Sequence, residues 1–198
     1  EAALAEPTAV CVHAVSLSES NSKKNLSESK ILIQGAGAIG FLCGLILNKD
    51  KKCLDITISD PNQLRLNECS KYLDAKFVSP ENKDLKQNSF DIVFDTVGLE
   101  ISRQQAIQTI SPGGIIVHVG LTQATGSFDF RKLTIQEVMI VGTYCYTNKD
   151  FEKSIEILNN KILGSLDWIE FRALKDGANA FRQIHDGTCV APKIILIP

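Results

Sequence analysis

The sequence predicts a doubly wound α/β fold, in which helices cover both faces of a parallel sheet. Short apolar runs of strand length alternate with segments of helical period along residues 30–158. The connections between these segments are short, and a glycine-rich turn follows the first apolar run directly. Because strands that alternate with helices pair in parallel through right-handed crossovers, this order predicts a sheet with helices on both sides.

The individual elements follow from the apolar periodicity. Residues 1–17 are predicted to be helical, with a break at Glu6-Pro7 because a residue before proline avoids the helical conformation. Residues 16–30 are polar and without a period, which predicts a surface connection. Strands are predicted over residues 30–34, 54–59, 90–95, 115–119 and 138–143, and helices over 38–48, 61–73, 101–110 and 150–158. A terminal unit of strand, helix and strand is predicted over residues 164–198.

The composition is that of an ordinary soluble globular protein. Hydrophobic residues make up 44% of the 198 residues, charged residues make up 22%, and the formal net charge is −2. This balance provides no basic surface for nucleic acid, and no apolar run approaches the roughly 20 residues of a membrane-spanning helix. We therefore expect no nucleic-acid or membrane partner. The beginning of the chain also lacks the basic and apolar regions of a signal peptide.

The six cysteines are dispersed, at positions 11, 43, 53, 69, 145 and 189. None of them forms the C-x₂-C pair that is typical of zinc sites and redox motifs. Free thiols are usual in a reducing compartment, so the cysteine pattern predicts a cytoplasmic protein.

A glycine turn, Gly35-Ala36-Gly37-Ala38-Ile39-Gly40, joins the first predicted strand to the first helix of the alternation. In a G-x-G-x-x-G turn the first glycine permits the tight bend, the second lets the backbone approach a pyrophosphate, and the third lets helix and strand pack closely. The helix N-terminus then directs free N–H groups at the anion. The motif alone is weak evidence, but its place between a strand and a helix predicts a dinucleotide site of the Rossmann type.

Asp60 ends the second predicted strand, twenty residues after Gly40. A carboxylate at this position can accept both hydroxyls of an adenosine ribose. It also disfavours a 2′-phosphate, by roughly 4 kcal/mol per charge pair at about 4 Å and an effective dielectric near 20. We therefore predict NAD as the cofactor. Two alternatives remain open: Arg65 could turn toward a 2′-phosphate, and Asp60 could serve only as a turn residue in Asp-Pro-Asn.

At this point the chain resembles the medium-chain dehydrogenases/reductases, and in particular their zinc-dependent polyol branch, which includes sorbitol and L-idonate dehydrogenases. The resemblance extends over essentially the whole chain. The stretches that carry it are EPTAVCVHAV, ILIQGAGAIGFLCGLIL, ITISDPNQLRL, SFDIVFDTVG, ISPGGIIVHVGL, VGTYCYTNKDFEKSIEIL and LKDGANAFRQIHDGTCVAPKIILIP.

The resemblance implies hydride transfer between NAD and a secondary alcohol, such as a sugar alcohol or sugar acid, with zinc polarising the substrate oxygen. It implies that Glu6 lies at or beside the catalytic zinc, although Glu6 could also be only a helix-entry carboxylate before Pro7. The cofactor-binding residues that it implies are Gly35, Gly37, Ala38, Ile39, Gly40, Asp60, Arg65, Thr96, Val97, Gly98, Val119, Gly120 and Leu121.

The chain departs from the family in one large respect. The family's catalytic domain carries a cysteine and a Gly-His-Glu motif for zinc, and here no His-Glu pair and no cysteine cluster occur. The resemblance therefore implies a fragment that is inactive alone and contains no catalytic residue. Residues 1–28 would be the connection from a missing catalytic domain, residues 29–163 the Rossmann domain, and residues 164–198 a terminal segment that returns to the catalytic domain.

Two other functions fit parts of the sequence. S-adenosylmethionine-dependent methyltransferases share the glycine turn, the acid after the second strand and the pattern of residues 90–114. The third glycine and the continuation of the chain after residue 119 favour a dinucleotide instead. A non-catalytic NAD-binding or oligomerising module is the other alternative.

Two further features concern association and histidine chemistry. Residues 138–143 are apolar on both faces and contain no proline, which is typical of an edge strand that pairs with another copy, so a homodimer or higher homo-oligomer is predicted. The open alternative is that the terminal segment covers this strand.

His118 alternates with Val117 and Val119, so it faces either the cofactor cleft or the opposite side of the sheet.

Overall fold

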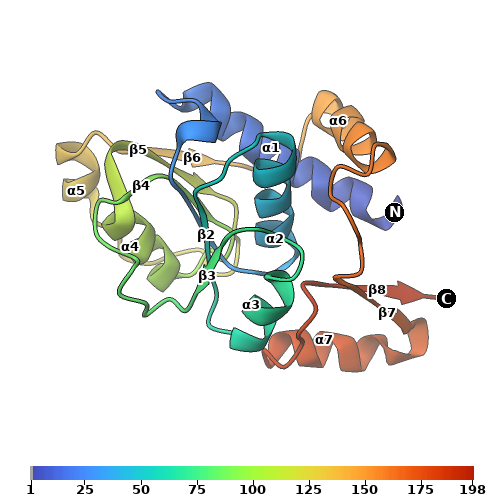
Figure 1. Cartoon of the computed structure of the whole chain (residues 1–198). Coiled ribbons are helices and arrows are strands. Elements are labelled where there is room, and N and C mark those ends of the chain that lie inside the picture. Colours follow the sequence, from blue (N-terminus) through green and yellow to red (C-terminus); the bar gives the residue numbers. More distant parts are fainter. Residues whose placement is uncertain (1) are drawn as a thin grey trace.

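The computed structural model describes residues 2–198 and is built around a six-stranded parallel sheet (Figure 1). The strand order is β3-β2-β1-β4-β5-β6, so the chain starts in the middle of the sheet and winds outward in both directions. This topology confirms the predicted doubly wound fold. The strands are β1 (Ile31–Gln34), β2 (Ile56–Ser59), β3 (Lys76–Val78), β4 (Phe90–Asp95), β5 (Ile110–His118) and β6 (Met139–Gly142).

Helices cover both faces of this sheet. Figure 1 shows α1, α2 and α6 on one side of it and α4 and α5 on the other. The α-helices of this part are α1 (Ala5–Asn21), α2 (Ala38–Leu45), α3 (Gln63–Cys69), α4 (Glu100–Thr109), α5 (Phe130–Ile135) and α6 (Asn148–Asn159). Short helical turns are η1 (Ala2–Leu4), η2 (Leu26–Glu28) and the π-helical η3 (Ile46–Asp50).

Two apolar cores result from this arrangement, one on each face of the sheet. Ile33 and Phe94 belong to the core under α1 and α2, whereas Leu32 and Val93 belong to the core under α4. Neighbouring residues in a strand point to opposite faces, so a strand that is buried on both sides is apolar throughout. This is why the central strands have no polar alternation in the sequence.

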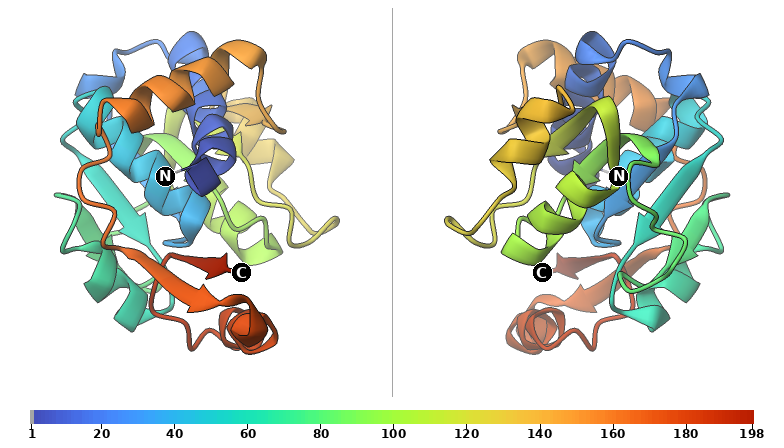
Figure 2. Two further views of the ribbon diagram at one scale, coloured as in Figure 1. Left: turned by 90° about the vertical axis from the view of Figure 1, so that its right-hand side faces the viewer. Right: turned by 90° about the vertical axis from the view of Figure 1, so that its left-hand side faces the viewer.

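The terminal segment forms a separate parallel pair of strands (Figure 2). It consists of β7 (Ile169–Ala173), the short turn η4 (Leu174–Asp176), α7 (Gly177–His185) and β8 (Lys193–Ile197). The predicted order of strand, helix and strand is thereby confirmed. Trp168 precedes β7 and is 1% exposed, with its ring edge-on to Phe41 at 5.3 Å, so it attaches this unit to α2.

The predicted helix break at Glu6-Pro7 is wrong. α1 continues from Ala5 through Pro7 without interruption. Pro7 is the third residue of the helix, where the backbone N–H that proline lacks would have no partner within the helix.

The predicted surface connection over residues 16–30 is also wrong in its first part, since α1 extends to Asn21. Ser18, Ser20 and Asn21 donate side-chain hydrogen bonds to carbonyl oxygens three or four residues earlier in the helix. Ser18 is fully buried because α1 packs on the sheet. Tertiary packing thus keeps a polar stretch helical that its composition alone would not.

Sequence reasoning missed two elements, β3 and α5. β3 has three residues and lies at one edge of the sheet, where only Val78 is buried, so its apolar alternation is too short to detect. α5 has six residues and none of them is buried. At the opposite edge of the sheet, β6 lies where an edge strand was predicted, with four residues instead of six.

Candidate functional site

The carboxyl ends of four adjacent strands meet at one edge of the sheet. The glycine turn follows β1, Asp60 follows β2, Thr96–Gly98 follows β4, and Val119–Leu121 follows β5. Parallel doubly wound sheets bind ligands at this edge, where the winding direction of the chain reverses. The fold therefore brings the sequence-predicted cofactor residues to a single edge.

The glycine turn has the geometry that its three glycines suggested. Gly35 has φ +97°, which is left-handed backbone that favours glycine. A Cβ on Gly40 would lie 2.0 Å from the carbonyl oxygen of Gly35, so this glycine is required for helix-to-strand packing. A Cβ on Gly37 would meet no atom within 4 Å. Gly37 thus leaves open space in front of the N-terminus of α2.

This open space is part of a cleft of about 330 Å³ between the glycine turn and the terminal segment. Gly37, Ala38 and Arg65 line one side of it. Lys193, the first residue of β8, lines the other side together with apolar residues of α7 and β8. No motif in the sequence marks Lys193, and only the packing of β8 brings it to the glycine turn.

Asp60 is 6% exposed and braces the glycine turn. One carboxylate oxygen accepts a hydrogen bond from the Ala36 N–H at 2.8 Å, and the other accepts from the Asn62 N–H at 2.8 Å. Each oxygen retains acceptor capacity, because a carboxylate offers about four lone-pair sites. Asp60 can therefore hold the turn and accept a ligand hydroxyl at the same time.

Arg65 lies beside Asp60, one turn into the next helix. Its Nη1 is 3.8 Å from Asp60 Oδ2, and its Nη2 donates to the Cys189 carbonyl oxygen at 3.0 Å. The guanidinium is thus held between the acid and the terminal segment. This contact reduces its freedom to turn toward a 2′-phosphate.

A second pocket, of about 290 Å³, lies next to Asp60 between the ends of β1, β2 and β4. Its walls include Pro61 and Val97, whose apolar surfaces suit a flat ring. Gln34 and Ser59 also line this pocket. The side-chain oxygen of each is buried without a hydrogen-bond partner. Sequence reasoning found neither residue, because each is the last residue of its strand and belongs to no motif.

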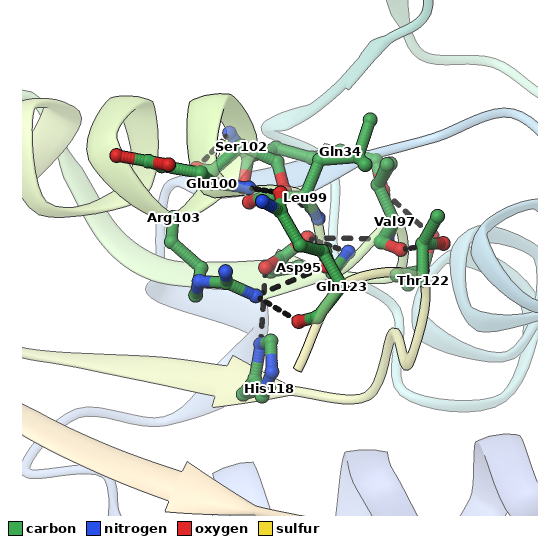
Figure 3. A network of polar contacts seen from close by, with 12 residues as sticks. Gln34, Asp95, Val97, Leu99, Glu100, Ser102, Arg103, His118, Thr122 and Gln123 are labelled. Carbon is green, nitrogen blue, oxygen red and sulfur yellow. Dashed lines mark hydrogen bonds and ion pairs between the residues drawn. The ribbon is translucent and has the colours of Figure 1, made fainter. Parts of the chain in front are cut away.

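The segments after β4 and β5 are joined through Asp95, the last residue of β4 (Figure 3). Its side chain accepts hydrogen bonds from the N–H groups of Val97 and Gly98, at 3.1 and 2.8 Å. Its carbonyl oxygen accepts from the N–H groups of Val119 and Gly120, both at 2.9 Å. One residue therefore positions both of these predicted cofactor segments.

Asp95 is ionised in this environment. Its burial would raise the pKa of the carboxyl group, but hydrogen bonds from His118 and from the Gly98 N–H outweigh this and hold the pKa below its usual value. Asp95 therefore remains an acceptor-only group at neutral pH.

His118 lies on the α4 and α5 side of the sheet. It lines a third pocket, of about 460 Å³, together with Arg103, Phe128 and Ile140. Two of the predicted cofactor residues, Gly120 and Leu121, line the same pocket. The Nδ1 of His118 lies 3.0 Å from Asp95 Oδ2. The side chain of His118 therefore points to the α4 and α5 face of the sheet, beside the segment that follows β5.

The described residues hold no metal centre on their own. Within residues 2–198, no group of three or more His, Cys, Asp or Glu side chains is placed to bind a metal ion. Glu6 is exposed in the first turn of α1. All six cysteines are free thiols. In the same part of the chain, no helix combines the length and apolar character needed to cross a membrane.

Comparison with known proteins places this geometry in a family. The family model described as zinc-binding dehydrogenase matches residues 38–160, which include five of the six strands of the sheet. A Saccharomyces cerevisiae protein described as probable diacetyl reductase ((R)-acetoin forming) 2 is 33% identical over 170 residues. The match covers 79% of this chain and 39% of that protein.

Two solved structures share the fold. L-idonate 5-dehydrogenase from Escherichia coli is 24% identical with a TM-score of 0.82, and the match covers 98% of this chain and 56% of that one. Acetophenone reductase from Geotrichum candidum in complex with NAD is 19% identical with a TM-score of 0.81, covering 94% and 52%. The match thus covers between 39% and 56% of the length of these three proteins. From the family match and the yeast relative together, we conclude that this chain belongs to the zinc-binding dehydrogenase family.

Proposed function

We propose that this chain is the cofactor-binding part of an NAD-dependent, zinc-type alcohol or polyol dehydrogenase. The observation that carries this proposal is the open space at Gly37, before the N-terminus of α2 and beside Asp60. It provides unpaired N–H groups for a pyrophosphate next to a carboxylate for a ribose. Family membership supports the reaction class, since the relatives are dehydrogenases and reductases.

The pockets suggest how the dinucleotide lies. Its adenine fits the pocket between Pro61 and Val97, and its adenosine ribose lies against Asp60. The pyrophosphate occupies the cleft over Gly37, where Lys193 can offset its charge. Thr96–Gly98 then lies along the middle of the cofactor and Val119–Leu121 at its nicotinamide end. When bound, the nicotinamide supplies the hydride chemistry, which belongs to the cofactor and not to the protein.

The described residues do not fit a catalytic zinc. Such a site needs about three protein ligands and one open position, and Glu6 alone cannot provide them. In our proposal the zinc ligands and the residues that recognise the alcohol belong to the part of the protein that this chain does not include. The sugar-alcohol or sugar-acid substrate is therefore proposed from family resemblance alone.

The terminal segment supports this division. Phe171, Leu174, Phe181 and Ile184 are between 50% and 73% exposed, so β7, η4 and α7 present an uncovered apolar surface. The start of α1 and the end of β8 lie on the same side of the molecule (Figure 2). We propose that residues 1–28 and 164–198 connect to and pack against the catalytic domain, and that residues 29–163 form the cofactor domain.

A cytoplasmic homodimer completes the proposal. β6 is an edge strand, and Met139 and Ile140 on it are 44% and 41% exposed. An unpaired apolar edge of this kind pairs readily with a second copy around a two-fold axis. The cytoplasmic location rests on the free cysteines, which suit a reducing compartment.

The two alternative functions have less support. A methyltransferase site does not require the third glycine, whereas Gly40 is needed here for contact with Gly35, and the family match is to dehydrogenases. A non-catalytic NAD-binding module would use the same cleft. It differs from our proposal only in the activity of the complete protein.

Calorimetric titration of the chain with NADH and NADPH tests the proposal. We expect NADH to bind more tightly, because Asp60 repels the 2′-phosphate of NADPH. Asp60→Ala should narrow the difference between the two dissociation constants. Asn67→Ala is the matched control and should leave the difference unchanged, because the Asn67 side chain accepts a hydrogen bond from Gln63 on the surface of α3. Equal affinities in the wild-type chain, or no binding of either cofactor, would contradict the proposal.

A further inference from the structure

His118 forms a hydrogen bond that the proposed cofactor chemistry does not explain. The histidine is the last residue of β5 and directly precedes Val119–Leu121. Its Nδ1 lies 3.0 Å from Asp95 Oδ2, and its side chain is 30% exposed, whereas that of Asp95 is fully buried. The neighbouring inward-facing position on the same face of β5 is the apolar Ile116. A polar side chain at this place therefore requires a reason other than packing.

The partner of His118 already carries four hydrogen bonds. Asp95 Oδ1 accepts from the N–H groups of Val97 and Gly98, and the Asp95 carbonyl oxygen accepts from those of Val119 and Gly120. The hydroxyl of Ser102 also lies beside this carboxyl group and helps to lower its pKa. His118 donates to Oδ2, and in doing so it joins the end of β5 to the residue that holds both predicted cofactor segments (Figure 3).

The two segments that Asp95 joins have little freedom to shift against each other. A Cβ on Gly98 would lie 2.2 Å from the carbonyl group of Gly120, and one on Gly120 would lie 2.2 Å from Val97. Thr122 Oγ1 also donates to the Val97 carbonyl oxygen. The backbones are therefore in direct contact, and a small rotation at the start of the segment would separate them.

Arg103 closes the other flank of the same network. Its Nη1 donates to the carbonyl oxygens of Gly98 and Gln123, at 3.0 and 2.9 Å. Residues 119–123 are thus tied to the segment after β4 at their far end by Arg103. At the beginning of this segment, next to residue 119, the side-chain hydrogen bond is the one between His118 and Asp95.

We propose that His118 is a positioning residue for the nicotinamide end of the cofactor site. By holding Asp95 it fixes Val119–Leu121 against Thr96–Gly98. This inference rests on the proposed function. It assigns the effect to one end of the site. Gly37 and Asp60 at the other end share no hydrogen bond with His118. Val97, which lines the proposed adenine pocket, donates to Asp95 Oδ1, and this bond does not involve the oxygen that His118 holds.

The test compares two ligands on the full chain. NADH carries the nicotinamide, whereas ADP-ribose has the same adenosine, pyrophosphate and second ribose without it. In His118→Leu we expect the dissociation constant of NADH to rise about tenfold, as it does when only a tenth of the molecules retain the binding-competent arrangement. The dissociation constant of ADP-ribose should stay within about twofold of the wild-type value. His118→Asn retains an N–H donor near the place of Nδ1 and should restore most of the NADH affinity.

The possible results distinguish a failure of the positioning role from a failure of the proposed function. A loss of affinity for both ligands in His118→Leu would indicate a merely structural role and overturn the positioning role, as would unchanged NADH binding. The enhanced fluorescence of bound NADH gives a second measurement, because it reports the immobilisation of the nicotinamide ring, and it should decrease in His118→Leu. If the wild-type chain binds neither ligand, the proposed function itself is wrong and the positioning role is wrong with it. If the wild-type chain binds both, only the variants decide.

Discussion

Gly37 and Gly40 are three residues apart and have opposite surroundings. The space next to Gly37 is open, whereas Gly40 is in contact with the backbone of Gly35. The same residue type therefore serves two purposes at this turn. Gly37 leaves open space before the N-terminus of α2, and Gly40 allows α2 to pack against the end of β1.

This difference predicts separable effects for two substitutions. Gly40→Ala should destabilise the fold by about 1–3 kcal/mol through overpacking, despite the better helix propensity of alanine. Thermal denaturation should then show a melting temperature lower by about 3–10 °C for a chain of this size. Gly37→Ser keeps a residue suited to the N-cap and should change the stability by less than about 0.5 kcal/mol.

For the affinity for NADH we expect the opposite ranking, with the larger loss in Gly37→Ser. The Cβ and hydroxyl of Gly37→Ser occupy the proposed pyrophosphate space, so NADH should bind at least about tenfold more weakly, a loss near 1.4 kcal/mol. Calorimetric titration of the folded variant measures this. Wild-type affinity in Gly37→Ser would mean that the pyrophosphate lies elsewhere.

At the scale of the elements, α1 and α6 are linked by a polar contact. His13 Nδ1 on α1 lies 2.9 Å from Asp150 Oδ2 on α6. Asp150 also accepts from the Thr147 N–H and forms a capping box with Thr147 at the start of α6. Burial would raise the pKa of Asp150, but hydrogen bonds from Thr147 and His13 outweigh it and lower the pKa. The ionised carboxylate therefore stabilises the folded state.

Asp150→Asn should lower the free energy of unfolding at pH 7 by about 1–2 kcal/mol, the range of a lost helix cap. Because the folded-state pKa is depressed, this contribution is present above the unfolded pKa, near 3.9, and disappears as the pH falls through the folded-state value. Urea denaturation of both proteins at several pH values checks this. The difference between them should shrink below about pH 4.

His13→Ala is the matched control, since it removes the bond between the helices and leaves the capping box intact. Its effect at pH 7 should be smaller than that of Asp150→Asn. If His13→Ala were the more destabilising variant, the capping box would not be the main contribution of Asp150.

For the whole molecule, β6 determines how two copies can associate. The sheet has two edges, but β3 at the other edge has only three residues, and its first residue, Lys76, is an exposed lysine. β6 has no charged residue among its four, and Ile140 is 41% exposed. Charged residues and short strands blunt an edge, so β6 is the edge that remains available for pairing.

We expect a homodimer in sedimentation equilibrium at micromolar concentration, and we expect Ile140→Lys to weaken it. A charge in the centre of an interface costs at least about 2 kcal/mol, which corresponds to roughly thirtyfold in the dimer dissociation constant. Leu54→Lys, at a residue that is 79% exposed outside β6, should leave the dimer unchanged. A monomeric wild-type chain would contradict the proposed association.

The sequence by itself determined the central sheet, the glycine turn and the position of Asp60 at the end of the second strand. These features depend on local requirements. The apolar runs reflect burial on both faces of a strand, and Gly35 and Gly40 reflect a left-handed backbone and a close contact within six residues of chain. The order of strands and helices then implied which strand ends would meet, because crossovers in such sheets have one handedness.

Only the tertiary structure decided how distant segments complete the site. Lys193 reaches the cleft over Gly37 because Trp168 anchors the terminal segment on α2, and no local pattern encodes that contact. The unpartnered oxygens of Gln34 and Ser59, and the bond between His118 and Asp95, depend on which neighbours a strand residue meets on each face of the sheet. Periodicity shows that a residue is buried, whereas the packing of the neighbouring elements determines what it touches.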